Sequence, residues 1–228
     1  MHQYLQLVRE VLANGQVVKT RNGERLTKYG AHLEFEMRQG FPMITTAKKN
    51  YWNIAGELCW FLSGETNTKK LKEWNIGIWD GNADADGNVG QAYGYQWRKW
   101  QGWLDQVTGS VEMAMNNPAS TRNLVTAWNP AALDSVVLPP CHYSYQIHTP
   151  PDRTISLQAT MRSTDLMVGL PYNISSYATL LMLYAGLTNR KPDRLIMDLG
   201  NVHIYSQHMK NTKIQIMRNP LALPSLEI

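Results

Sequence analysis

The clearest signal of fold class lies in residues 153–187, RTISLQATMRSTDLMVGLPYNISSYATLLMLYAGL. The first part, from Arg153 to Thr160, is rich in residues that favour extended backbone and predicts a strand. The last part, from Ile174 to Leu187, is apolar on nearly every side and predicts a helix buried against other elements. A strand that leads into a buried helix indicates a sheet with helices packed on it.

The rest of the chain mixes helical and extended patterns without a regular order. Helical spacing predicts helices over 4–12, 51–62, 67–73 and 103–116, and the start of another over 203–209. Extended patterns predict strands over 29–37, 123–128, 143–148 and 195–199, and a strand-like end over 213–228. Because no repeating strand–helix–strand rhythm is present, α+β is favoured over a doubly wound sheet. Without repeats or linkers, residues 1–228 are expected to form a single domain.

Composition narrows the class of protein. The 228 residues are 43% hydrophobic and 18% charged, as in ordinary globular chains. Two cysteines cannot build a disulfide scaffold, and the absence of a Cys/His cluster predicts no metal. No leader-like or membrane-spanning stretch is found, so a cytoplasmic protein without membrane contact is expected. The net charge of +4 fits a small anionic ligand, whereas scattered basic pairs such as Lys48-Lys49 argue against nucleic acid as the main partner.

The two cysteines have different surroundings. Cys59 lies within an apolar helical pattern and is expected to be an inert core thiol. Cys141 follows Pro139-Pro140 at the start of an expected strand, where the rigid pair can hold a side chain outward. A thiolate is a strong nucleophile, so Cys141 is a candidate catalytic residue, although the residues alone leave a structural role open. His142 is a poor base for it, because adjacent strand residues point to opposite faces.

A second candidate site lies within residues 161–173. Arg162 and Ser163 at a strand end suit a phosphate, since the guanidinium supplies a charged fork and the hydroxyl a further donor. The Asn173 amide has both a donor and an acceptor and could read a base edge that carries O and N–H. A second interpretation stays open, in which Asn173 only caps the following helix.

These residues belong to a longer series of motifs. In chain order they are GFP at 40–42 with TT at 45–46, ELCWFL at 57–62 with G at 64 and TN at 66–67, IWD at 78–80, YG at 93–94 with QWR at 96–98, AWN at 127–129, PCH at 140–142, the stretch 162–173, and HIYS at 203–206 with H at 208. Through them the chain resembles the thymidylate synthase family over nearly its whole length. Several separated motifs in one order are far more specific than a single short pattern.

The resemblance implies a fold, a reaction and a partner. The fold would be α+β, with a large twisted mixed sheet, helices packed on one face, and sheets that lie back to back in a homodimer. The substrate would be deoxyuridine monophosphate (dUMP), with 5,10-methylenetetrahydrofolate as the one-carbon donor and no metal.

The resemblance also implies roles for individual residues. Cys141 would add to C6 of the pyrimidine, Glu57 would relay protons through water, and Tyr93 would orient the water that removes the C5 proton. Asn173 would read O4 and N3–H of uracil and stabilise the charge that gathers on O4. The other matches would bind ligands: Arg21, Arg162, Ser163 and the partner subunit's Arg122 the phosphate, His203 and Tyr205 the ribose hydroxyl, Asp165 the pterin, and Trp79 the folate.

Two electrostatic expectations accompany these roles. Arg162 would favour the Cys141 thiolate. Desolvation within an apolar helix would raise the pKa of Glu57, which suits a group that gains and loses protons. Without the resemblance, Glu57 would be interpreted as a member of a structural hydrogen-bond network.

The chain departs from the family's pattern at several positions. Met161 stands where a Gln usually precedes the Arg-Ser pair, Thr121 replaces the first of two arginines, and Ala47 replaces a lysine near the folate tail. The sequence stops at Ile228, before the C-terminal segment that closes over the folate in the family, and such lids exclude water from reactive intermediates.

These departures favour one product over another. Water that reaches the one-carbon unit would give 5-hydroxymethyl-dUMP, as in the bacteriophage nucleotide hydroxymethylases, which also carry Met before the Arg-Ser pair. A deoxyuridylate hydroxymethylase is therefore the leading hypothesis, in the host cytoplasm if a bacteriophage encodes it. The alternative is a thymidylate synthase that makes dTMP and dihydrofolate, and the remote alternative is an inactive nucleotide- or RNA-binding homologue.

Overall fold

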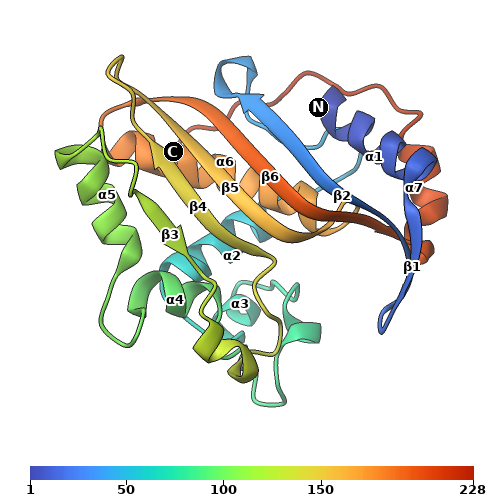
Figure 1. Ribbon diagram of the computed structural model, residues 1–228, viewed down its shortest axis with the longest axis horizontal. Coiled ribbons are helices and arrows are strands. Elements are labelled where there is room, and N and C mark those ends of the chain that lie inside the picture. The colour runs from blue at the N-terminus through green and yellow to red at the C-terminus, as the bar shows by residue number, and fades with distance from the viewer.

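A six-stranded sheet forms the centre of the computed structural model, which describes residues 1–228 (Figure 1). The strands lie in the order β1-β2-β6-β5-β4-β3. Their bounds are β1 Gln16–Thr20, β2 Gly23–Glu36, β3 Leu124–Thr126, β4 His142–His148, β5 Thr154–Asp165 and β6 Lys191–Tyr205. All neighbours are antiparallel except β5 and β6, which are parallel, so the sheet is mixed.

The parallel pair arises from a single crossover through helix α6 (Gly169–Leu187). Parallel neighbours need such a connection, because the chain must return to the same end of the sheet. The register places Ser163 beside Asn201 and Asp165 beside His203. The residues expected to bind phosphate and ribose therefore lie on adjacent strands near the beginning of α6.

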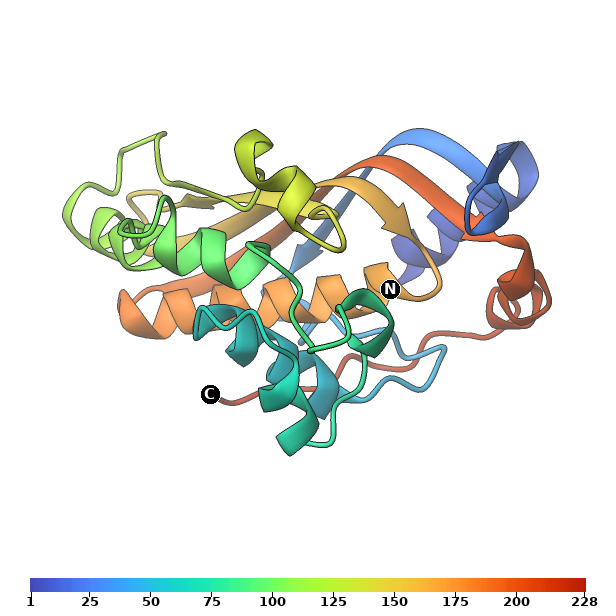
Figure 2. The ribbon, with the colours of Figure 1, turned by 90° about the horizontal axis from the view of Figure 1, so that it is seen from below.

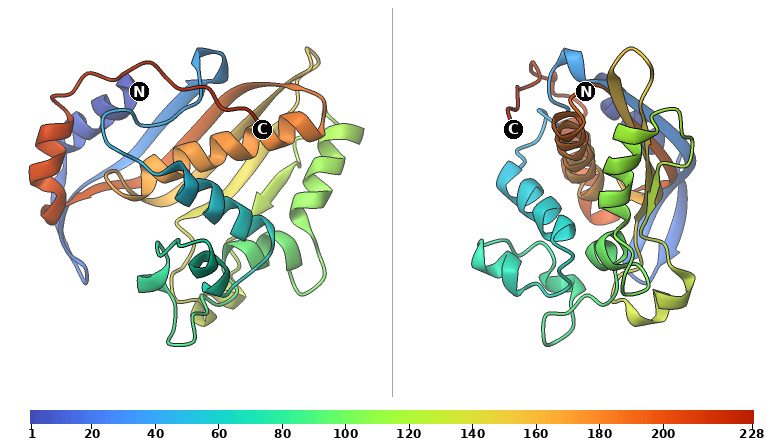
Figure 3. Two further views of the ribbon diagram at one scale, coloured as in Figure 1. Left: turned by 180° about the vertical axis from the view of Figure 1, so that it is seen from behind. Right: turned by 90° about the vertical axis from the view of Figure 1, so that its left-hand side faces the viewer.

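The helices cover one face of the central strands and leave the other face uncovered, as the view from below shows (Figure 2). α6 packs directly on β5 and β6, and α2 (Tyr51–Leu62) packs on the outer side of α6 (Figure 3). Most side chains of α6 are buried, because the helix lies between the sheet and α2. The expected α+β fold with a mixed sheet and helices on one face is thereby confirmed.

Smaller helices complete the two ends of the sheet. α3 (Lys69–Glu73), α4 (Tyr93–Lys99) and α5 (Gln106–Asn116) lie towards β3 and β4, whereas α1 (His2–Asn14) and α7 (Met209–Gln215) lie towards β1 and β2 (Figure 1). Short 3-10 helices occur at Met37–Gln39, Asp80–Asn82, Pro130–Ser135 and Ser206–His208. No helix has both the length and the apolar character that crossing a membrane requires.

The helix predicted over 51–62 has the same bounds in the structure. Its first turn is capped by Asn50, whose side-chain oxygen accepts a hydrogen bond from the Trp52 N–H at 3.0 Å. Cys59 of this helix is exposed, so the prediction of a core thiol was wrong. Leu58 and Trp60 take the inward positions on either side of it, and Cys59 points outward.

The predictions for the C-terminal part were also wrong. Residues 203–205 continue β6 instead of starting a helix, because they pair with residues 25–27 of β2. Residues 213–215 belong to α7, and no strand follows it. Pro220 and Pro224 lack the N–H groups that a strand donates. This segment instead lies against residues 41–45, and Pro224 C=O accepts a hydrogen bond from the Phe41 N–H at 2.8 Å.

Candidate active site

Most of the residues singled out from the sequence gather around one cavity of about 360 Å³ where β5 and β6 end. This volume falls in the range of small-ligand pockets, about 300–1,000 Å³. Eight of those residues line it: Cys141, Arg21, Arg162, Ser163, Asp165, Asn173, His203 and Tyr205. The sheet register and the α6 crossover bring these separate segments together.

Cys141 lies immediately before β4 and is held through its backbone on both sides. Its N–H donates to the Tyr93 hydroxyl at 2.7 Å, and its C=O accepts from the Arg162 N–H at 2.8 Å. The fixed backbone leaves the thiol on the cavity wall. Burial raises the pKa of the Cys141 thiol, and the charge of Arg162 lowers this pKa by a smaller amount. Arg162 thus favours the thiolate as expected, but desolvation outweighs it.

The Arg162 side chain ties β5 to the segment that precedes the cysteine. Its Nε donates to the Pro140 carbonyl and its Nη2 to the Pro139 carbonyl, both at 2.8 Å. Its guanidinium carbon lies 5.5 Å from the centre of the Trp128 ring. These contacts fix the guanidinium at the cavity and leave Nη1 free to bind an anion.

Aromatic rings form the wall behind Cys141. His142 stacks on Tyr93 with ring centres 4.3 Å apart, and its Nδ1 lies 2.8 Å from the Tyr177 hydroxyl. Burial lowers the pKa of His142 to about 3, so its ring is neutral at physiological pH. His142 does not line the cavity, which supports the prediction that it is a poor base for Cys141.

Glu57 and Trp79 lie behind this wall, outside the cavity lining. The Trp79 indole N–H donates to the Glu57 carboxylate at 2.7 Å. Burial raises the pKa of Glu57 to about 7, and the indole N–H limits the rise. Burial raises the pKa of Tyr93, whose hydroxyl holds Cys141, and the Cys141 and Glu57 charges raise it further. Trp79 is only 6% exposed, because its ring packs among Trp60, Phe61 and Tyr93.

Asp165 and Asn173 have separate tasks at the start of α6. One Asp165 carboxylate oxygen accepts the N–H groups of Met167 and Val168 at 2.8 and 3.1 Å and forms the turn before the helix. α6 then begins at Gly169, earlier than the predicted Ile174. Asn173 therefore lies inside the helix and is not its cap, and its amide faces the cavity.

His203 and Tyr205 line the cavity from β6. His203 Nδ1 lies 2.9 Å from the Asn201 side-chain oxygen, and its Nε2 lies 3.4 Å from Arg25 Nη1. Desolvation, together with the charge of Arg25, lowers the pKa of His203 to about 4. The His203 and Tyr205 rings meet edge to face, 5.2 Å apart.

Arg25 lines the same cavity and was missed from the sequence. The predicted strand began at residue 29, whereas β2 begins at Gly23 and pairs Arg25 with Tyr205. The stretch GERLTK at 23–28 lacks the apolar alternation that marks a strand. The one signal in the sequence was the position of Arg25 four residues after Arg21, the arginine already expected to bind the phosphate.

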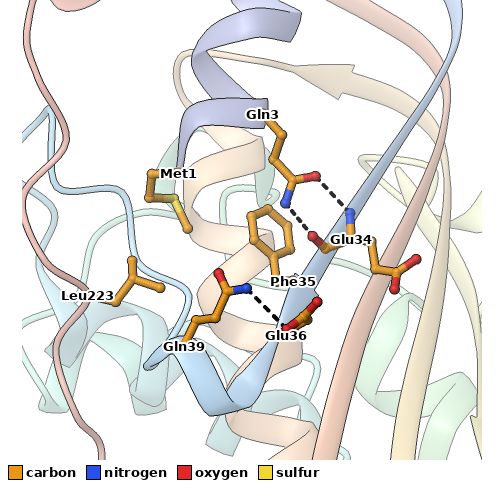
Figure 4. A pocket seen from close by; sticks show the side chains of 7 residues that line it. All are labelled: Met1, Gln3, Glu34, Phe35, Glu36, Gln39 and Leu223. Atoms are coloured by element: carbon orange, nitrogen blue, oxygen red, sulfur yellow. Dashed lines mark hydrogen bonds between the residues drawn. The ribbon is translucent and has the colours of Figure 1, made fainter.

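Arg122 lies apart from the cavity. It is exposed in the loop between α5 and β3, at the far edge of the sheet. A cavity of about 770 Å³ lies next to it and contains Thr121 and Arg194. A smaller cavity of about 260 Å³ lies between α1 and β2, lined by Gln3, Glu34 and other residues that include no cysteine or cationic side chain (Figure 4). Neither cavity contains a cysteine.

The cavity holds no metal site, and the chain as a whole matches a known family. No group of three or more His, Cys, Asp or Glu side chains is placed to hold a metal ion. The family model of thymidylate synthase matches residues 2–228. Membership of this family implies folate-dependent one-carbon transfer to dUMP. On this match over nearly the whole chain, the protein belongs to the thymidylate synthase family.

Proposed function

We propose that Cys141 is the nucleophile of a one-carbon transfer to C5 of dUMP. The observation that carries the proposal is the cavity that joins Cys141 to Arg21, Arg162 and Asn173. Addition of the Cys141 sulfur to C6 forms an S–C6 bond and moves an electron pair of the C5–C6 double bond towards O4. C5 then becomes nucleophilic, and the S–C6 bond breaks again when the product leaves.

The polar residues of the cavity fit the two ends of this nucleotide. The Asn173 amide offers a donor to O4 and an acceptor to N3–H of uracil, and its donor stabilises charge that develops on O4. Arg21, Arg162 and Ser163 supply N–H and O–H donors for the phosphate. His203 and Tyr205 lie on the adjacent strand, where they would bind the ribose hydroxyl.

Glu57 and Tyr93 supply the acid–base chemistry of the proposal. A carboxyl with a pKa of about 7 is present in both protonation states near neutral pH, which suits a proton relay. Tyr93 accepts the Cys141 N–H and would orient the water that removes the C5 proton. Trp79 holds the Glu57 carboxyl through its indole N–H, and its contact with the folate is implied by the resemblance.

The residues beside the cavity fit a folate. Asp165 has one carboxylate oxygen bound to the α6 turn and a second oxygen able to accept an N–H of a pterin. The Lys49 ammonium lies 5.8 Å from the centre of the Tyr172 ring and interacts electrostatically with Asp165. Lys49 is therefore a cation beside the cavity that could bind the glutamate carboxylate of the folate. When bound, 5,10-methylenetetrahydrofolate would supply the one-carbon unit that C5 receives.

A homodimer with sheets back to back is also part of the proposal. Parallel strands are normally covered on both faces, yet β5 and β6 are covered by helices on one face only. A second subunit on the uncovered face would supply the missing cover. The partner subunit's Arg122 would then reach the phosphate, since Arg122 is exposed and far from the cavity of its own chain.

For the product, we propose 5-hydroxymethyl-dUMP. Met161 supports it, because this residue lines the cavity where the family usually has Gln and the bacteriophage hydroxymethylases have Met. The second candidate is dTMP with dihydrofolate, and the family match alone does not separate the two products. The two differ in whether water or hydride is added to the one-carbon unit on C5. Mass determination of the nucleotide product after incubation with dUMP and methylenetetrahydrofolate separates them.

The covalent step has its own test. 5-Fluoro-dUMP with methylenetetrahydrofolate should form a stable adduct, found by mass spectrometry on the peptide that contains Cys141. Cys141→Ser should abolish the adduct, and Cys59→Ser should leave it intact as the matched control. Absence of the adduct in the unaltered protein would contradict the proposed mechanism.

A further inference from the structure

We propose that Arg25 binds the phosphate of the nucleotide, in addition to the residues that the resemblance implies. This inference rests on the proposed function and adds one guanidinium to its phosphate site. Arg25 is half-buried on β2 and lines the cavity together with Arg21 and Arg162.

The Arg25 side chain is nearly unpaired within the protein. Its one hydrogen-bond contact is the 3.4 Å approach of Nη1 to His203 Nε2. Its Nε is buried and has no partner, and its guanidinium carbon lies 5.9 Å from the centre of the Tyr205 ring. No carboxylate lies within salt-bridge distance of any of its nitrogens. A guanidinium has five N–H donors, so most of its binding capacity is unused.

The cavity as a whole has an excess of positive charge. Arg21, Arg25 and Arg162 line it, and none of the three forms a salt bridge within the chain. The single carboxylate of the lining, Asp165, already accepts two backbone N–H groups through one oxygen. A partly buried charge without a partner is costly, and a dianionic phosphate would compensate it while accepting several N–H bonds.

A different role for Arg25 would be to hold His203 against the ribose. The contact that would perform it is long, and His203 is already held by Asn201 at 2.9 Å. The two roles differ in their ligand dependence. A phosphate role affects nucleotides and inorganic phosphate, whereas a ribose role affects the nucleoside and the nucleotide equally.

The test compares Arg25→Gln with the unaltered protein by isothermal titration at constant ionic strength, with dUMP, deoxyuridine and inorganic phosphate. We expect Arg25→Gln to weaken dUMP binding about 10- to 100-fold, because hydrogen bonds to charged groups contribute about 1.5–3 kcal/mol. Binding of deoxyuridine should change less than about threefold. Lys19→Gln is the matched control, since Lys19 is a highly exposed cation of the same hairpin, 3.8 Å from Glu24, and should leave all three affinities unchanged.

Two results would overturn the inference: unchanged binding of dUMP, or an equal loss for dUMP and deoxyuridine. If the unaltered protein does not bind dUMP, the proposed function fails, and the phosphate titration still decides the role of Arg25. Weaker phosphate binding by Arg25→Gln supports the role, and equal binding contradicts it. Arg25→Lys, which keeps the charge and loses the planar fork, should lose less affinity than Arg25→Gln and serves as the folded variant if the glutamine protein does not fold.

Discussion

Replacing Glu57 by glutamine is expected to stabilise the protein at pH 8 and to leave its stability unchanged at pH 4. Burial raises the pKa of this carboxyl from its ordinary value of 4.5 to about 7. Well below pH 4.5 both the folded and the unfolded chain carry the proton, so ionisation of this carboxyl has no effect on stability. Between 4.5 and 7 only the folded chain binds the proton, so the free energy of unfolding falls as pH rises. Glutamine stays neutral and still accepts the Trp79 N–H, so the variant avoids this loss.

The size of the effect follows from the pKa difference of about 2.5. At 1.36 kcal/mol per pH unit, the full difference in the free energy of unfolding is about 3 kcal/mol above pH 7. Urea unfolding of both proteins at half-unit steps from pH 4 to pH 8, at one protein concentration, measures it. Glu112→Gln, on the exposed side of α5, is the control and should follow the unaltered protein at every pH. Parallel curves for Glu57→Gln and the unaltered protein would refute the reasoning, because the carboxyl would then not be desolvated.

Four further outcomes follow from the site geometry. Cys141→Ser should retain dUMP binding within about threefold and lose turnover, and measurable tritium release from C5-labelled dUMP would contradict the nucleophile assignment. Alkylation of the Cys141 thiol should have a midpoint above the ordinary pKa of a thiol, because burial raises this pKa. Arg162→Gln should move the midpoint higher, and a lower midpoint in that variant would oppose the electrostatic argument. The His142 ring should show no titration between pH 5 and 8 by NMR, since its pKa is about 3, and a midpoint near 6.5 would mean that the ring is solvated. Gly94→Ala should cost about 1–3 kcal/mol of unfolding free energy in urea, because a new Cβ would lie 2.9 Å from the Phe61 carbonyl oxygen, and an unchanged midpoint would show that α4 can move away from α2.

Local signals explain which parts of the fold could be predicted. The bounds of α2 were predicted correctly because its apolar spacing runs from Tyr51 to Leu62 and Ser63-Gly64 ends it. α6 was predicted to start too late because its first turn contains Pro171, which usually ends a helix. Proline is tolerated there, since the N–H groups of the first turn have no partner within the helix. The turn before the helix is formed by the Asp165 carboxylate. The last strand pairs with β2, a contact between residues about 180 positions apart that no local pattern encodes.

The site residues divide in the same way: residues with a local sequence signal were predicted, and a residue positioned by long-range strand pairing was not. Cys141, Arg162 and Asn173 were found because their residue types and neighbours match a chemistry and a family. Arg25 was missed because its position depends on the pairing of β2 with β6. Cys59 was misassigned because a helix that is apolar in sequence still has one face towards solvent.

The parallel register of β5 and β6 limits how such a chain can vary. Ser163 opposite Asn201 and Asp165 opposite His203 form a fixed grid in which side chains alternate between the two faces of the sheet. Inserting or deleting one residue within either strand would turn every following side chain to the opposite face and separate the groups that meet at the cavity. Length variation is therefore expected in the exposed parts of loops, such as residues 84–86 and 151–153, whereas the strands that carry the site can change by substitution only.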